Sequence, residues 1–194
     1  MTGVQTCALP ISLTTNVLTG VLALTTAAAY LALYTPLKTR SPISTLVGAF
    51  PGAMPTLIGW AAASRRLNAE AMILYGMLFL WQFPHLMAIA WMYREDYDRA
   101  GYLVLPKKHA RLFCVILQTI LPLFGLISLS LIQLPPRHAV VFCCTGLLLG
   151  LGFLYFGLKF ALGLSRAAAR RLLAASIAYL PLLFILQATL RSAT

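Results

Sequence analysis

Charged residues are scarce in this chain, and acidic residues are the scarcest. Only 4 of its 194 residues are Asp or Glu, and charged residues make up 10% of the total. Hydrophobic residues reach 60%, and the mean hydropathy is +0.86. This composition excludes an ordinary soluble domain and fits a bilayer environment. Low-complexity tracts, soluble linkers and clear short repeats are also missing, so the sequence predicts one membrane-embedded domain.

Cysteine ligand motifs are absent as well. No Cys-x-x-Cys or Cys/His metal spacing occurs, and Cys114, Cys143 and Cys144 lie inside apolar runs. Adjacent residues on a helix point about 100° apart, so Cys143 and Cys144 do not converge on one metal. We interpret these cysteines as buried small hydrophobic residues.

Six apolar stretches are long enough to cross a bilayer, which takes about 20 helical residues. Five of them are residues 41 to 64, 71 to 93, 112 to 136, 138 to 158 and 172 to 190. The sixth, residues 13 to 34, is rich in Ala, Leu and Thr and carries no charge. The sequence therefore predicts an all-α fold, a polytopic transmembrane helix bundle with six spans.

The basic residues follow the loops between these spans. The net charge is +11, but the cations are spread over short loops, which argues against a nucleic-acid partner. The first, third and fifth loops carry 2, 5 and 4 of them, whereas the other two loops and the tail carry 2, 1 and 1. By the positive-inside rule, the first, third and fifth loops face the cytoplasm or the mitochondrial matrix.

The first eleven residues fit no targeting pattern, because they lack a basic n-region and a small-residue cleavage site. They resemble a translated sequencing adapter. We therefore expect residues 1–11 to be non-native, the transmembrane domain to occupy residues 12–194, and the native gene to continue upstream.

Three of the four acidic residues fall in the stretch Trp91-Met-Tyr-Arg-Glu-Asp-Tyr-Asp-Arg-Ala-Gly101, at the end of the third span. Ionisable groups beside a bilayer are costly, so such a cluster indicates a functional site. The alternative is a set of surface ion pairs, because Arg94 with Asp98 and Glu95 with Arg99 have i,i+4 spacing.

The stretch Trp81-Gln-Phe-Pro-His85 precedes this cluster in the same span. If the helix persists past Met92, Gln82, His85, Asp96 and Arg99 share one stripe, and His85 and Asp96 lie about 16 Å apart along the axis. An intramembrane histidine favours function, although a hydrogen bond to a neighbouring helix would also explain it.

The first two spans carry proline and glycine signals. Pro36 is expected to stop or kink the first span, just before the cations Lys38 and Arg40. Pro51 and Pro55 predict a kink in the second span. Gly48 and Gly52 predict close packing of this span against another helix, and Gly146 and Gly150 predict close packing of the fifth span. Tyr34 and Lys38 are either site residues or an interfacial anchor pair.

Four segments together resemble the intramembrane UbiA prenyltransferases, and in particular their haem-farnesylating branch. They are Tyr34-Thr-Pro-Leu-Lys38, Gly48-Ala-Phe-Pro-Gly-Ala-Met-Pro-Thr-Leu-Ile-Gly-Trp60 and the two tryptophan-led segments above. The resemblance runs from about Ser12 to the last span. It implies a bundle of nine spans, of which these six look like the fourth to the ninth. The missing part would hold the first Asn/Asp-rich motif, so we expect the chain as given to be inactive.

The resemblance implies transfer of a farnesyl group from farnesyl diphosphate to a vinyl group of haem B, which is a substrate here. The catalytic residues would be Asp96, Arg94, Lys38 and Tyr34. Mg²⁺ prefers carboxylate and phosphate oxygens, so its ligands would be Asp96 with Glu95 or Asp98. Substrate would contact His85, Trp81, Gln82, Arg40, Arg99 and Trp91. The aromatic faces of Trp81, Phe83, Trp91 or Tyr34 would stabilise the allylic cation.

On the haem side, His85 would act as an iron ligand or a polar contact, and Arg40 or Lys107 would pair with the propionates. Other partners implied are the lipid bilayer and a haem A synthase or oxidase assembly factor. The location implied is the bacterial plasma membrane or, alternatively, the mitochondrial inner membrane. Two other readings stay open: a UbiA relative that prenylates an aromatic or quinone precursor, and a non-catalytic transport or assembly subunit.

Overall fold

Helices, joined by short turns, make up most of the described structure. The computed structural model describes residues 15–38, 40–41, 43–101, 111–132 and 139–192, and no strand occurs among them. The chain divides into two compact units. The first holds α2 to α4 and α5 up to Phe79, and the second holds the rest of α5 together with α6 to α9. The prediction of an all-α bundle is confirmed.

In the first unit, α2 (Val17–Ala28) continues as a π-helix, η1 (Ala29–Tyr34), and as α3 (Thr35–Leu37). Asn16 caps α2 by accepting a hydrogen bond from the Thr19 amide, and its own amide donates to the Ala61 carbonyl of α4 at 2.9 Å. The wide π turn ends next to Pro36, which lacks the N–H of a regular helix. The helix therefore ends at Leu37, one residue beyond the predicted stop at Pro36.

The second span, α4 (Ser44–Ser64), is one uninterrupted helix with Pro51 and Pro55 inside it. α5 (Ala69–Met92) follows. Their contact is a cluster of apolar side chains from α2, α4 and α5: Met54, Leu57 and Ala71, with Leu22, Ile58, Trp60 and Tyr75 packed against them. The close packing predicted for Gly48 is confirmed, because a Cβ there would lie 2.7 Å from the Tyr34 ring.

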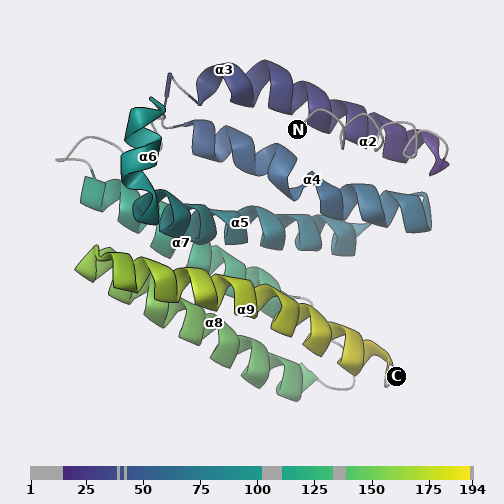
Figure 1. The fold of residues 1–194 in the computed structure, drawn as a ribbon. Coiled ribbons are helices and arrows are strands. Elements are labelled where there is room, and N and C mark those ends of the chain that lie inside the picture. The colour runs from purple at the N-terminus through teal and green to yellow at the C-terminus, as the bar shows by residue number, and fades with distance from the viewer. Residues whose placement is uncertain (1–14, 39, 42, 102–110, 133–138, 193–194) are drawn as a thin grey trace. The chain divides into compact units, whose positions relative to one another are not determined.

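The second unit contains α6 (Arg94–Arg99), α7 (Arg111–Ile132), α8 (Ala139–Gly163) and α9 (Arg166–Ser192). α7 packs on α8 and α8 packs on α9, as Figure 1 shows. Glycines of α8 allow this approach, since a Cβ at Gly150 would lie 2.6 Å from Ile127 and one at Gly157 would lie 2.6 Å from Leu123. The glycine packing predicted for the fifth span is therefore confirmed at Gly150.

Six helices of the described residues are long and apolar enough to span a membrane: Val17–Leu37, Ser44–Ser64, Ala69–Met92, Phe113–Ile132, Val140–Gly163 and Arg166–Thr189. The prediction of six spans is confirmed. The chain is an integral, multi-pass membrane protein.

The predicted ends of the last two spans were wrong. Reading charge-free runs placed Lys159, Arg166 and Arg170 in a loop, but all three are helical, and only Leu164 and Ser165 separate α8 from α9. Lysine and arginine are good helix formers whose long side chains reach the membrane surface from the last turns of a span. A charge near a helix end therefore does not mark where the helix stops.

The burial predicted for the cysteines was also wrong in part. Cys144 is exposed on the surface of α8, and Cys114 and Cys143 are half-buried. In a membrane helix an exposed cysteine side chain faces lipid, which is as apolar as a protein core.

Candidate functional site

The Trp81–His85 segment is fixed against α9 by hydrogen bonds. The Trp81 indole N–H donates to the Ser176 carbonyl at 2.8 Å, and His85 Nδ1 lies 2.8 Å from the Ser176 hydroxyl. The two rings stack with their centroids 4.4 Å apart and their planes inclined by 23°. Ser176 is buried, at the centre of the α9 face that packs inward. His85 therefore makes the hydrogen bond to a neighbouring helix that the sequence offered as the structural alternative to a functional role.

The Ser176 hydroxyl contacts two groups. It lies 2.8 Å from His85 Nδ1 and also donates to the Leu173 carbonyl of its own helix at 2.7 Å. Nδ1 is therefore the ring nitrogen that faces α9, and Nε2 is the ring nitrogen left to contact another group.

Trp91 lies at the end of α5 and is 5% exposed. Its ring meets Phe160 of α8 edge to face, with centroids 5.9 Å apart, and Arg94 lies 5.5 Å above it. This cation–π contact orients Arg94 at the start of α6. Trp91 therefore supports a charged residue of the cluster, and one of its faces is already covered.

The acidic cluster lies on α6, beyond a turn at Tyr93. Glu95 pairs with Arg166 of α9 at 2.7 Å and with Arg94 at 3.9 Å, and Asp96 pairs with Arg99 at 3.7 Å. The i,i+4 pairs that the sequence suggested are not among the ion pairs of the described residues. The contact between Glu95 and Arg166 places the third and fifth loops at the same membrane face, as the positive charges predicted.

The helix does not persist past Met92, so the continuous stripe from His85 to Asp96 was wrong. Tyr93 has φ −106° and ψ 26°, which ends α5 before α6 begins. His85 and the acidic cluster nevertheless contact α9 at different positions along its length. His85 contacts Ser176, and the arginines near Asp96 are six and ten residues earlier, about 9 and 15 Å along the helix.

A cavity of about 260 Å³ opens beside Asp96, lined by Met92, Tyr93, Asp96, Arg166 and Arg170. It brings one carboxylate together with two guanidinium groups. Arginine binds phosphate oxygens in a forked geometry, and a carboxylate binds hard cations. The cavity therefore suits an anion that carries a divalent metal.

Three residues of these contacts were not predicted from the sequence: Arg166, Arg170 and Ser176. A signal was present for the two arginines, because the loop charges had already placed them at the same face as the acidic cluster. No sequence signal pointed to Ser176, which lies 91 residues from His85 along the chain.

The remaining predicted residues have the following places. Asp98 and Arg99 are exposed on α6, and Gln82 is half-buried on α5. In the first unit, Tyr34 and Lys38 are half-buried at the end of η1 and α3, and Arg40 is exposed after them. The Tyr34 ring packs against the Gly48 backbone and lies 5.1 Å from the Tyr30 ring. Lys107 lies outside the described residues.

A sequence model described as the UbiA prenyltransferase family matches residues 2–186 of the chain. The chain belongs to the UbiA prenyltransferase family. This confirms the resemblance carried by the four sequence segments, and it agrees with the six membrane-spanning helices. No solved structure matches the chain.

Several individual members of this family are similar to the chain and carry a more specific name. The chain is 45% identical over 170 residues to a protein named protoheme IX farnesyltransferase from Solibacter usitatus, covering 87% of this chain and 58% of the relative. It is 41% identical over 187 residues to one from Koribacter versatilis, covering 90% and 59%. A human protein named mitochondrial protoheme IX farnesyltransferase is 38% identical over 189 residues, covering 94% and 42%. The chain thus spans 58–59% of the length of these bacterial relatives.

UbiA prenyltransferases generally use a divalent metal with diphosphate substrates. Among the described residues, no three His, Cys, Asp or Glu side chains converge to hold a metal ion. Mg²⁺ is usually held by only one or two carboxylates together with substrate phosphates. Asp96, facing Arg166 and Arg170, therefore fits a metal that arrives with a diphosphate.

Proposed function

We propose that the complete protein transfers a farnesyl group from farnesyl diphosphate to a vinyl group of haem B, forming haem O. The observation that carries this proposal is the Asp96 cavity, where a carboxylate and two arginines lie together at the membrane face. The choice of haem as the acceptor and of a farnesyl donor rests on the names of the similar proteins, protoheme IX farnesyltransferases.

In this proposal, Arg166 and Arg170 bind the diphosphate oxygens, and Asp96 holds the metal against them. Bound Mg²⁺ would add positive charge that favours departure of the diphosphate. Arg99 pairs with Asp96 at 3.7 Å and Arg94 begins the same helix, so both add positive charge at α6. Lys38 stays a proposed catalytic residue. Glu95 acts as a positioning residue, because its carboxylate holds Arg166 at 2.7 Å. In this proposal Glu95 is not a metal ligand, and Asp98 is the alternative to Asp96 as a ligand.

The bond chemistry requires a dry, apolar site. The C–O bond of farnesyl diphosphate breaks, its electron pair leaves with the diphosphate, and an allylic cation remains. The vinyl group attacks that cation, and water then adds to the haem side chain and loses a proton. Aromatic faces stabilise such a cation while apolar walls exclude water until the C–C bond has formed. One face of Trp91 is covered by Arg94 and one face of Trp81 by the His85 ring, so each of these indoles has one face left for this role.

His85 belongs to the haem side of the proposal. Its Nε2 nitrogen would contact either the haem iron or a polar group of the porphyrin. Trp81 and Gln82 would contact the same substrate, and Arg40 would pair with a propionate. The Ser176 contact and the two arginines are about 9–15 Å apart along α9, so the haem side and the diphosphate side of the proposed site would lie at different levels of this helix.

The proposed location is the bacterial plasma membrane, with a haem A synthase or oxidase assembly factor as the next user of haem O. Relatives from bacteria and from human mitochondria both occur.

The proposal is tested with the protein expressed from its native gene, in membranes supplied with haem B, farnesyl diphosphate and Mg²⁺. We expect haem O to form, Asp96→Asn to lower its formation about a hundredfold or more, and Glu70→Gln, at the other end of α5, to leave it unchanged. Prenylation of an aromatic quinone precursor with no haem product would support the other UbiA reading. If neither acceptor is prenylated, a binding or assembly role replaces catalysis.

A further inference from the structure

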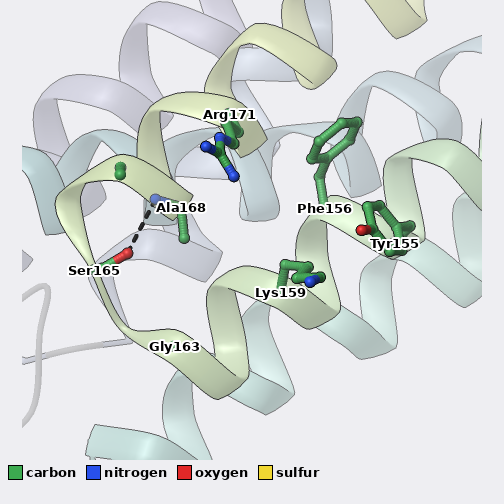
Figure 2. Close-up of a pocket in the computed structure, with 8 residues that line it drawn as sticks. Tyr155, Phe156, Lys159, Gly163, Ser165, Ala168 and Arg171 are labelled. Atoms are coloured by element: carbon green, nitrogen blue, oxygen red, sulfur yellow. Dashed lines mark hydrogen bonds between the residues drawn. The ribbon is translucent and has the colours of Figure 1, made fainter.

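A second cavity lies at the turn between α8 and α9. Its volume is about 440 Å³, and it shares no lining residue with the Asp96 cavity. Figure 2 shows Lys159 on α8 and Arg171 on α9, one from each of the two helices, with Tyr155 and Phe156 beside them. The remaining lining residues are small: Gly163, Ser165, Ala167 and Ala168. None of the functional residues proposed above uses this cavity.

The charges in the cavity are all of one sign. Lys159 and Arg171 are its charged lining residues, and no acidic side chain lines it. Within the described part of the chain, neither residue forms an ion pair, and Lys159 instead lies 5.5 Å from the centre of the Tyr155 ring. The N-terminus of α9 adds a positive end of a helix dipole, where Ser165 accepts a hydrogen bond from the Ala168 amide. The cavity is therefore lined by two cations and the N-terminus of α9, and no acidic lining residue neutralises them.

The depth of each residue matches the layers of a bilayer. The turn at Leu164 and Ser165 marks the membrane face. Lys159 lies four residues before the end of α8 and Arg171 five residues after the start of α9, about 6 and 7.5 Å inward. Tyr155 lies eight residues before that end, about 12 Å inward. Cations thus sit at the level of lipid headgroups, and an aromatic wall continues into the hydrocarbon.

We propose that this cavity binds the phosphate headgroup of an anionic membrane lipid, with the lipid chains against Tyr155 and Phe156. Basic pockets between spanning helices on the cytoplasmic or matrix side recognise anionic headgroups. The loop charges place this turn on that side, where anionic lipids are concentrated. The apolar aromatic wall distinguishes a lipid from free phosphate, which has no chain to bury. The inference does not depend on farnesyl transfer.

The test is native mass spectrometry of the protein from its native gene, in detergent with phosphatidylglycerol or phosphatidylcholine. We expect the wild type to retain phosphatidylglycerol in preference to phosphatidylcholine. Each cation removed should weaken binding about fivefold, so Lys159→Gln with Arg171→Gln should weaken it about 25-fold. The matched control is Arg65→Gln with Arg66→Gln, which removes the same charge at the turn between α4 and α5 and should bind like the wild type.

Two results would overturn the proposal. One is unchanged phosphatidylglycerol retention in the Lys159/Arg171 variant, whose folding is checked by circular dichroism. The other is displacement of the lipid by millimolar inorganic phosphate, which would show that the cavity binds a free anion. If the double variant does not fold, the two single variants serve instead, and each should lose about fivefold.

Discussion

The two ends of the candidate site are built differently. Trp81 and His85 are held by direct hydrogen bonds to the buried Ser176 of α9. Glu95, Asp96 and Arg99 are exposed and are joined only by ion pairs. Buried hydrogen bonds fix a side chain in one orientation, whereas exposed ion pairs are weak and exchange partners easily. Trp81 and His85 are therefore preorganised, whereas the charged end is free to rearrange around a ligand.

The largest effect should come from the charged end. Asp96→Asn keeps the size of the side chain but removes the charge that would hold the metal. We expect haem O formation in membranes to fall by about a hundredfold or more, the scale of losing one key electrostatic contact. The thermal stability in detergent should stay within about 0.5 kcal/mol, because Asp96 is exposed. A large loss of stability would show that Asp96 is structural and would contradict the comparison.

Ser176→Ala tests the preorganised end. It removes the hydroxyl that pairs with His85 Nδ1, so the free energy of unfolding in detergent should fall by about 2 kcal/mol. Product formation should fall as well, because the orientation of the His85 ring is no longer fixed. Ser128→Ala is the matched control, since Ser128 is exposed on α7 and bonds only to its own helix at Phe124. Equal effects of the two changes would show that the Ser176 contact is not special.

Gly48→Ala tests whether Tyr34, in the first unit, is also held in place by packing. The new Cβ would lie 2.7 Å from the Tyr34 ring, so the ring must move. We expect a net loss of about 1 kcal/mol in thermal unfolding, because overpacking outweighs the helix-propensity gain of alanine. Gly59→Ala in the same helix meets nothing within 4 Å and should stabilise the protein slightly. If the two variants behave alike, Tyr34 is not held by Gly48.

The smallest effect is expected for Arg99→Gln. Its ion pair with Asp96 is 3.7 Å long, and its side chain is 79% exposed. Exposed pairs contribute about 0–1 kcal/mol, so we expect a change in unfolding free energy below about 0.5 kcal/mol and little change at high salt. A salt-dependent loss above about 1 kcal/mol would show that the charged end is as rigid as the end formed by Trp81 and His85.

The existence of the helices could be predicted from the sequence more reliably than their ends. The existence of all six spans followed from hydropathy, since a bilayer sets both the length and the composition of a helix. The boundaries of the last two spans were wrong, because Lys159 and Arg166 are compatible with a helix end at the membrane surface. The break at Tyr93 was missed for a similar reason, because no proline or glycine marks it.

The sequence by itself determined that the chain spans a membrane six times, that its third and fifth loops share one face, and that it belongs with the UbiA prenyltransferases. These properties depend on runs of apolar residues, on sums of loop charges and on local motifs. Only the tertiary structure decided that Arg166 and Arg170 join Asp96 and that Ser176 holds His85. The packing of α9 against α5 and α6 joins residues 70 or more positions apart, and no local pattern specifies that register.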